Sequence, residues 1–331
     1  MRITREFLLR IAKETVQKRI HSDPGLVAAY LTGSLLTENP FLGGATDIDL
    51  VFIHTGEIKL HREIVPLTPE IHLDIRHDAR VEYEKPKELR VHPFLGPELY
   101  NPMSLHATQH FFEFVQAGVR DKYHEPASVL ARSRRLAEAS RQIWSELQTI
   151  QASGVELVLI YLKAVHLAAN SIALLSGGPL PERRLLLQLP QRAEAVGVPD
   201  LAAMVFGLLG ANQIDMEKLK ELLPEWEKAF IEAASKPQVE ERIAAPRLGY
   251  YKLAIEALLT SETPQVVIWP LIHTWTLAVS VLPPMWTVHW HSACTLLGLD
   301  GAVFDERMDG LDRLLDKIEE LLEKTAARQG L

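Results

Sequence analysis

The chain has 331 residues, 47% of them hydrophobic, and a formal net charge of −8 at pH 7. A chain of this length can bury a full core, and its single cysteine, Cys294, excludes an intramolecular disulfide and a multi-cysteine zinc site. The acidic balance makes nucleic acid an unlikely main partner, because proteins that bind it usually present a basic surface to the phosphates.

The first hundred residues predict a small α/β unit. Residues 4–20 have apolar side chains at helical spacing with charged residues between them, so we expect an amphipathic helix and not a signal peptide. Three short apolar runs predict strands at 27–31, 47–53 and 71–76. We therefore expect residues 1–100 to form a domain with a small mixed sheet.

From residue 101 onward, the strand pattern gives way to helical periodicity. Helices are expected at 104–118, 127–152, 155–176, 182–196, 200–209, 215–236, 247–260, 264–281, 286–298 and 302–327. The Pro-rich stretch 91–102 marks the boundary, and residues 101–331 are expected to form a larger all-α domain that binds an acceptor or a partner. The predicted fold class is therefore α+β.

The most membrane-like run of the sequence is 266–284. Pro270 and His273 interrupt it, and it is too short and too polar to cross a bilayer. We therefore expect a cytoplasmic protein with no membrane partner, which fits the low cysteine content. An oligomer is compatible with the sequence.

The second predicted strand carries two carboxylates on one face. Residues i and i+2 of a strand point the same way, so Asp47 and Asp49 lie side by side. Such like charges repel unless one is protonated, a Lys or Arg pairs with them, or a divalent cation binds. Asp74, on a strand that could be a neighbour, adds a third carboxylate. Three converging carboxylates favour a metal site, because hard oxygen ligands suit Mg²⁺ or Mn²⁺.

A Gly-Ser pair follows the first predicted strand. Gly33 would let the backbone approach an anion closely, and the Ser34 hydroxyl with exposed N–H groups could hold phosphates. A Gly-Ser pair alone is a weak signal, because most such pairs are simple turns. Phosphate together with metal suggests a nucleotide.

At these positions the sequence resembles the nucleotidyltransferase superfamily, which includes DNA polymerase β, kanamycin nucleotidyltransferase and the minimal nucleotidyltransferases. The resemblance depends on Gly33-Ser34, a gap of twelve residues, Asp47-Ile48-Asp49-Leu50, and Asp74 on a later strand. It covers residues 26–76. The helical remainder is similar only in kind to the helical domains of the antibiotic-modifying branch.

The resemblance implies a two-metal transfer of a nucleoside monophosphate. Asp47 and Asp49 would bind both ions, and Asp74 would bind the catalytic one. Gly33 and Ser34 would hold the β- and γ-phosphates. The acceptor hydroxyl would lose its proton to Asp74, to a metal-bound hydroxide or to a residue of the helical domain, and the sequence does not choose among these.

Lys163 is the best counterpart of a lysine that contacts the triphosphate in several members of the superfamily. It lies in the predicted helix 155–176 and shares a polar stripe with Glu156 and Asn170, spaced seven residues apart. A solvated helix face explains the same spacing. A role for Glu156 as general base is a weaker alternative.

Polar residues near the carboxylates also have two interpretations. His72 and Arg76 flank Asp74 on its predicted face, so either could contact a nucleotide or an acceptor phosphate. Pairing with the carboxylates explains them equally well. His54, at the end of its strand, is more typical of a polar cap than of a catalyst.

Four of the six tryptophans fall within 22 residues, together with three histidines: Trp269, Trp275, Trp286, Trp290, His273, His289 and His291. Aromatic rings could line an acceptor pocket by stacking. Packing in the core or at a dimer interface is the favoured explanation. His289 and His291 do not share a helix face, which argues against a zinc pair.

The predicted function is a transferase that needs Mg²⁺ or Mn²⁺ and a nucleoside triphosphate. It would move a nucleoside monophosphate, AMP from ATP by preference, to a hydroxyl of a small molecule or a protein. The alternative is a non-catalytic nucleotide-binding or toxin–antitoxin type module. A third alternative, an RNA-tailing or tRNA-repair polymerase, is disfavoured by the acidic balance. The acceptor is not determined by the sequence.

Overall fold

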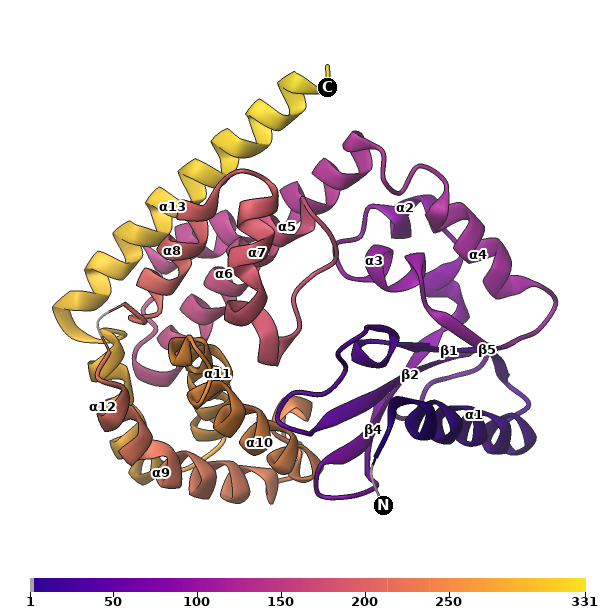
Figure 1. Ribbon diagram of the computed structural model, residues 1–331, viewed down its shortest axis with the longest axis horizontal. Helices are drawn as coiled ribbons and strands as arrows, with labels where there is room; N and C mark the ends of the chain where they lie inside the picture. The colour runs from indigo at the N-terminus through magenta and orange to yellow at the C-terminus, as the bar shows by residue number, and fades with distance from the viewer. Residues whose placement is uncertain (1–2, 213, 238) are drawn as a thin grey trace. The chain divides into compact units, whose positions relative to one another are not determined.

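The computed structural model describes residues 3–212, 214–237 and 239–331, and Figure 1 shows its helices and strands. The chain folds as two compact units, Met1–His124 and Glu125–Leu331. The sequence placed the boundary at 100/101 instead. Sheet and helical regions follow one another as expected, so the α+β fold class is confirmed.

The N-terminal unit contains a five-stranded sheet and four α-helices among its described residues. Its elements are α1 (Arg5–Ser22), β1 (Leu26–Thr32), η1 (Ser34–Leu36), β2 (Thr46–His54), β3 (Arg62–Pro66), β4 (Ile71–Ala79), η2 (Arg80–Tyr83), α2 (Pro86–Arg90), α3 (Leu95–Tyr100), β5 (Met103–Ala107) and α4 (Phe111–Arg120). The elements labelled η are short 3₁₀ helices.

The sheet is mixed, as predicted, with the strand order β3-β4-β2-β1-β5. β2 and β4 pair in parallel at the centre, and the other neighbours are antiparallel. Both central strands are buried along most of their length, which is typical of parallel strands covered on both faces.

Each face of the sheet carries its own hydrophobic core. Ile48, Leu50 and Phe52 of β2 pack with α1 on one face. Val51 and Ile53 pack on the other face with residues of α2, α3 and α4. Because side chains alternate along a strand, Asp47 and Asp49 lie on the second face. β2 contributes only Val51 and Ile53 to the buried residues of this second core, so Asp47 and Asp49 are not part of it.

Two strands correct the prediction from sequence. The helix expected at 104–118 is wrong in its first part, because residues 103–107 form β5 and pair with β1. β3 was not predicted at all. Both are short edge strands, and such strands depend on pairing with a neighbour more than on their own pattern.

The C-terminal unit is helical throughout its described elements. These are α5 (Pro126–Leu147), α6 (Gly154–Leu174), η3 (Glu182–Arg184), α7 (Leu185–Ala195), α8 (Pro199–Leu208), α9 (Met216–Ala234), η4 (Glu241–Ile243), η5 (Ala245–Arg247), α10 (Leu248–Leu259), η6 (Pro264–Val267), α11 (Ile268–Ser280), η7 (Pro284–Trp286), α12 (Thr287–Leu297) and α13 (Gly301–Arg328). α5 and α6 pack as an antiparallel pair, and the long α13 lies along α5 and α8 (Figure 1).

Among the described helices, α6 is long and apolar enough to cross a membrane. Its apolar window is 67% buried inside the protein. The core helix of a soluble protein meets the same criterion, so α6 is weak evidence for a membrane span. The run 266–284 contains α11, which has only 13 residues.

Candidate metal and phosphate site

The turn after β1 is built around Gly33. Its φ of 76° and ψ of −157° lie in a region essentially restricted to glycine. A Cβ on Gly33 would lie 1.8 Å from Oδ2 and 2.7 Å from Cγ of Asp49. The glycine therefore lets the Asp49 carboxylate rest against the backbone. The close approach expected at Gly33 is present, and contact with phosphate stays a prediction.

Ser34 ties this turn to the start of β2. Its Oγ lies 2.9 Å from Oγ1 of Thr46, which is fully buried. Thr37 Oγ1 donates a 2.7 Å hydrogen bond to the Ser34 carbonyl and closes the short η1 turn. The two ends of the loop between β1 and β2 are thereby held together. Binding of the β- and γ-phosphates by Ser34 stays a prediction.

Three buried ligating side chains meet on β2 and β4. The parallel register places Asp47 beside His72 and Asp49 beside Asp74. One ligand atom each from Asp47, His72 and Asp74 lies within 4.8 Å of the others. Their exposed fractions are 6%, 0% and 3%. Two buried carboxylates and an imidazole this close together form a set that could bind a metal ion.

The structure thus brings together two of the three predicted metal ligands. Asp49 is not in the group, and its carboxylate lies against Gly33. His72 takes part instead; the sequence suggested for it either a contact with nucleotide or acceptor phosphate or pairing with the carboxylates, and not metal binding. The sequence did contain a signal for this: His72 and Asp74 are two residues apart on one strand, so their side chains share a face. Metal binding by Asp49 remains a prediction.

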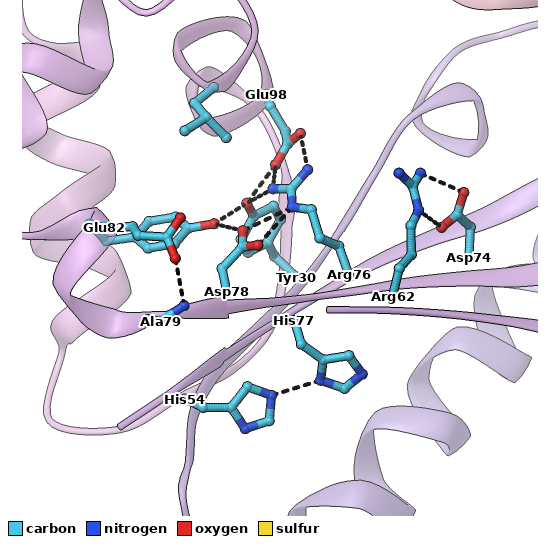
Figure 2. A network of polar contacts seen from close by, with 12 residues as sticks. Tyr30, His54, Arg62, Asp74, Arg76, His77, Asp78, Ala79, Glu82 and Glu98 are labelled. Carbon is cyan, nitrogen blue, oxygen red and sulfur yellow. Dashed lines mark hydrogen bonds and ion pairs between the residues drawn. The ribbon is translucent and has the colours of Figure 1, made fainter. Parts of the chain in front are cut away.

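Arg62 engages the third carboxylate, a contact that the sequence did not predict. Its Nε donates to Asp74 Oδ1 at 2.6 Å, and its Nη2 donates to Oδ2 at 2.8 Å, as Figure 2 shows. Arg62 begins β3, whose Ile64 pairs with Asp74. Because β3 was not recognised from its sequence, this guanidinium could not be placed.

Arg76 is the centre of a separate polar network on the same sheet face (Figure 2). Its guanidinium donates to both oxygens of Glu98, at 2.5 and 3.0 Å, and to those of Asp78, at 2.9 and 3.0 Å. Burial acts to lower the pKa of Arg76, but Glu98 and the neighbouring acidic groups outweigh it and raise the pKa. The pairing alternative for Arg76 is therefore what the structure shows, and nucleotide contact stays a prediction.

Two tyrosines complete the Arg76 network. Tyr30 Oη donates to Glu98 at 2.6 Å, and Tyr83 Oη donates to Asp78 at 2.5 Å. Burial, reinforced by the adjacent carboxylates, raises the pKa of both phenols. Both hydroxyls therefore stay protonated. This network links β4 to α3 and η2 on the sheet face that also carries Asp74.

His54 belongs to a chain of hydrogen bonds on the opposite face of the sheet (Figure 2). Its Nδ1 lies 3.1 Å from Asp23, and its Nε2 lies 2.8 Å from His77 Nδ1. His77 Nε2 then contacts Glu63 at 2.8 Å. Burial and the neighbouring His77 lower the pKa of His54. His54 is thus a structural residue of the strand end, as its position suggested.

The residues predicted on α6 fall into two environments. Lys163 and Glu156 are exposed, whereas Asn170 is fully buried. The Asn170 side chain accepts from the Leu180 amide at 2.7 Å and donates to the His166 carbonyl at 3.1 Å. Asn170 therefore has a structural role. The solvated alternative for Lys163 agrees with its exposure, and its contact with the triphosphate stays a prediction.

The tryptophan-rich segment mainly forms core. Trp269, Trp275 and Trp290 are at most 3% exposed. Trp290 Nε1 donates to Thr276 Oγ1 at 2.9 Å within this core. The packing interpretation of these rings is therefore the one that the structure supports.

A polar pair borders the Trp269 ring within the helical unit. His273 Nδ1 lies 2.7 Å from Glu182 Oε1. His166 stacks on Trp269 with ring centroids 5.4 Å apart, and burial lowers the pKa of His166 to about 4. This imidazole is consequently neutral near pH 7.

The donor set of Asp47, His72 and Asp74 fits a divalent ion. The two carboxylates offer oxygen ligands that suit such an ion, and the imidazole adds a nitrogen ligand. Buried like charges are stable only when paired or bound to metal. Arg62 supplies a positive charge at Asp74, and a bound ion would supply a second positive charge for the Asp47 side of the group.

Comparisons with known proteins do not assign a family to this chain. The sequence matches no model of a protein family and no curated protein. A solved nucleotidyltransferase-like protein from Exiguobacterium sibiricum is similar over 98% of this chain and 92% of its own, with 13% identity and a TM-score of 0.30. A TM-score and an identity this low support no argument about the fold or the activity of this chain. Any functional assignment must therefore depend on the side chains of the site.

Proposed function

We propose that this protein is a divalent-metal-dependent nucleotidyltransferase. It would transfer a nucleoside monophosphate, AMP from ATP by preference, to a hydroxyl of a small molecule or a protein. The observation that carries this proposal is the buried Asp47–His72–Asp74 group beside the Gly33 turn. A metal ligand set and a close backbone approach within one sheet are what a triphosphate and its ions require.

Each residue of the sheet site has its own role in the proposal. Asp47 and Asp74 would hold the ion, which when bound would neutralise the triphosphate and polarise the α-phosphate. Gly33 and Ser34 would orient the β- and γ-phosphates through backbone N–H groups and a hydroxyl. Asp49, held against Gly33, connects the phosphate turn to the metal ligands. Rigid placement of these groups lowers the barrier by positioning and electrostatic stabilisation.

The remaining assignments complete the proposal. Lys163 would contact the triphosphate, and Arg76 would stabilise the sheet face that carries the ligands. The acceptor is a hydroxyl compound or a protein side chain, and no nucleic acid or membrane is required. The protein would act in the cytoplasm.

Substitution of the carboxylates tests the proposal. We expect Asp47→Asn and Asp74→Asn to reduce metal-dependent release of pyrophosphate from ATP by at least about a hundredfold, the scale of losing one electrostatic group in an active site. Asp309→Asn, an exposed carboxylate of α13, is the matched control and should leave the rate unchanged. Full turnover in the Asp47→Asn and Asp74→Asn variants would show that these ligands are assigned wrongly.

A second candidate function is a non-catalytic nucleotide-binding module. The bidentate contact between Arg62 and Asp74 favours it, because a guanidinium already neutralises the carboxylate that would hold the catalytic ion. Calorimetry that detects ATP binding, with no pyrophosphate release across a broad set of acceptors, would support this candidate over the transferase.

A further inference from the structure

One of the three buried ligating side chains is an imidazole. The all-carboxylate set expected from the sequence would offer only oxygen atoms. In the structure, His72 contributes a ring nitrogen within 4.8 Å of the Asp47 and Asp74 ligand atoms. The site therefore offers nitrogen as well as oxygen.

The backbone fixes the position of His72 in this group. His72 is the register partner of Asp47 in the parallel β2–β4 pair, and it lies two residues from Asp74 on the same strand face. The central strands cannot slip without moving their whole hydrophobic set off the core. His72 is fully buried, so moving its ring into solvent would require the surrounding packing to open. The imidazole is therefore as firmly placed as the two carboxylates.

The ligand type determines which ion the group prefers. Mg²⁺ is a hard ion that favours oxygen ligands and retains its water. First-row transition ions bind nitrogen more readily, and Mn²⁺ also accepts carboxylates well. One imidazole among two carboxylates thus shifts the balance away from Mg²⁺.

We propose that His72 is a metal ligand and that it makes this site selective for Mn²⁺ over Mg²⁺. The inference rests on the proposed function in one respect, that an ion binds at Asp47 and Asp74. It does not depend on which reaction the ion serves. Its test therefore measures ion binding and needs neither a nucleotide nor an acceptor.

The test is a pair of binding titrations on the full chain. The electron paramagnetic resonance signal of free Mn²⁺ gives the Mn²⁺ dissociation constant, and competition with Mg²⁺ gives the Mg²⁺ dissociation constant. We expect the wild-type protein to bind Mn²⁺ at least about tenfold more tightly than Mg²⁺, and His72→Asn to reduce this ratio by about tenfold, the smallest effect usual for metal-site partners.

The matched control is His110→Asn. His110 has a side chain 93% exposed, and its φ of 57° is one that asparagine adopts readily. This substitution should leave both dissociation constants unchanged. Far-ultraviolet circular dichroism would show that each variant is folded.

A spectroscopic measurement on the wild-type sequence keeps the test valid even if His72→Asn does not fold. Pulsed electron paramagnetic resonance of bound Mn²⁺ should show coupling to an imidazole ¹⁴N, which changes to the ¹⁵N pattern in protein labelled with ¹⁵N-histidine. Asp47→Asn should remove this signal.

The outcomes separate the two proposals. Mn²⁺ binding without nitrogen coupling, or an unchanged Mn²⁺/Mg²⁺ ratio in a folded His72→Asn variant, would overturn the role of His72 and leave the transferase proposal standing. No binding of either ion to the wild-type chain would overturn both.

Discussion

Replacing Arg62 with glutamine should destabilise the N-terminal unit and free Asp74 for metal. In the wild-type protein, Arg62 donates two hydrogen bonds to the Asp74 carboxylate, at 2.6 and 2.8 Å. Glutamine keeps polar character but removes the positive charge. The variant therefore contains a buried carboxylate that has lost its cation, close to the carboxylate of Asp47.

The magnitude follows from the exposure of the two partners. The Asp74 side chain is 3% exposed and that of Arg62 is 34% exposed. Removing one partner of a fully buried pair costs about 3–5 kcal/mol, and screening by water at the exposed guanidinium reduces this to about 2 kcal/mol. Arg19→Gln is the control, because Arg19 pairs with Glu63 while 41% exposed and should cost at most about 1 kcal/mol.

The assay must report on the N-terminal unit alone. All six tryptophans lie in residues 125–331, so tryptophan fluorescence follows the helical unit. Hydrogen exchange of peptides from β2 and β4, measured by mass spectrometry, follows the sheet directly. Protection in these peptides gives the free energy of opening where exchange is limited by that opening.

Adding Mn²⁺ gives the decisive comparison. At a free concentration 100 times the dissociation constant, a bound ion stabilises the folded state by about 2.7 kcal/mol. Because Asp74 is released in Arg62→Gln, this variant should bind Mn²⁺ more tightly than the wild type and recover most of its lost protection. Equal losses of hydrogen-exchange protection in Arg62→Gln and Arg19→Gln would refute the reasoning. Equal Mn²⁺ affinity in Arg62→Gln and the wild type would refute it as well.

Three further predictions concern other parts of the molecule. Gly33→Ala should lower the free energy of unfolding by about 1–3 kcal/mol, because alanine is strained at this φ and its Cβ would displace the Asp49 carboxylate. Hydrogen exchange of β2 peptides should show the loss of protection, and unchanged protection would show that the Asp49 carboxylate does not lie against Gly33. Burial holds the pKa of His166 at about 4, below the unfolded value near 6.5. The unfolded chain then binds a proton that the folded chain does not, so as pH falls from about 6.5 to 4 the helical unit should lose up to about 1.4 kcal/mol of stability per pH unit. Fluorescence-monitored urea unfolding should show a weaker pH dependence in His166→Asn, and an unchanged slope would contradict the assignment. Lys163→Ala should weaken ATP binding by about tenfold if this lysine contacts the triphosphate, equal to the loss of roughly 1.4 kcal/mol; unchanged affinity in calorimetry would leave it as a solvated helix residue.

Much of the fold followed from periodicity in the sequence. The strands at β1, β2 and β4 and most helices of the second unit were expected, because their apolar side chains repeat at the spacing of one buried face. β3 and β5 were not found. Their five residues each carry too little pattern, and only hydrogen bonding to β4 and β1 makes them strands.

For the site, the sequence by itself determined which residues carry charge and which face of a strand they share. It indicated Asp47 and Asp74 as candidate ligands and Gly33 as a point of close approach, because two-residue alternation and glycine conformation are local properties. The tertiary structure alone decided that His72 joins Asp47, that Arg62 pairs with Asp74, and that Arg76 is bound by Glu98. These contacts depend on strand register and strand order, which are set by packing across the whole sheet and not by any one segment.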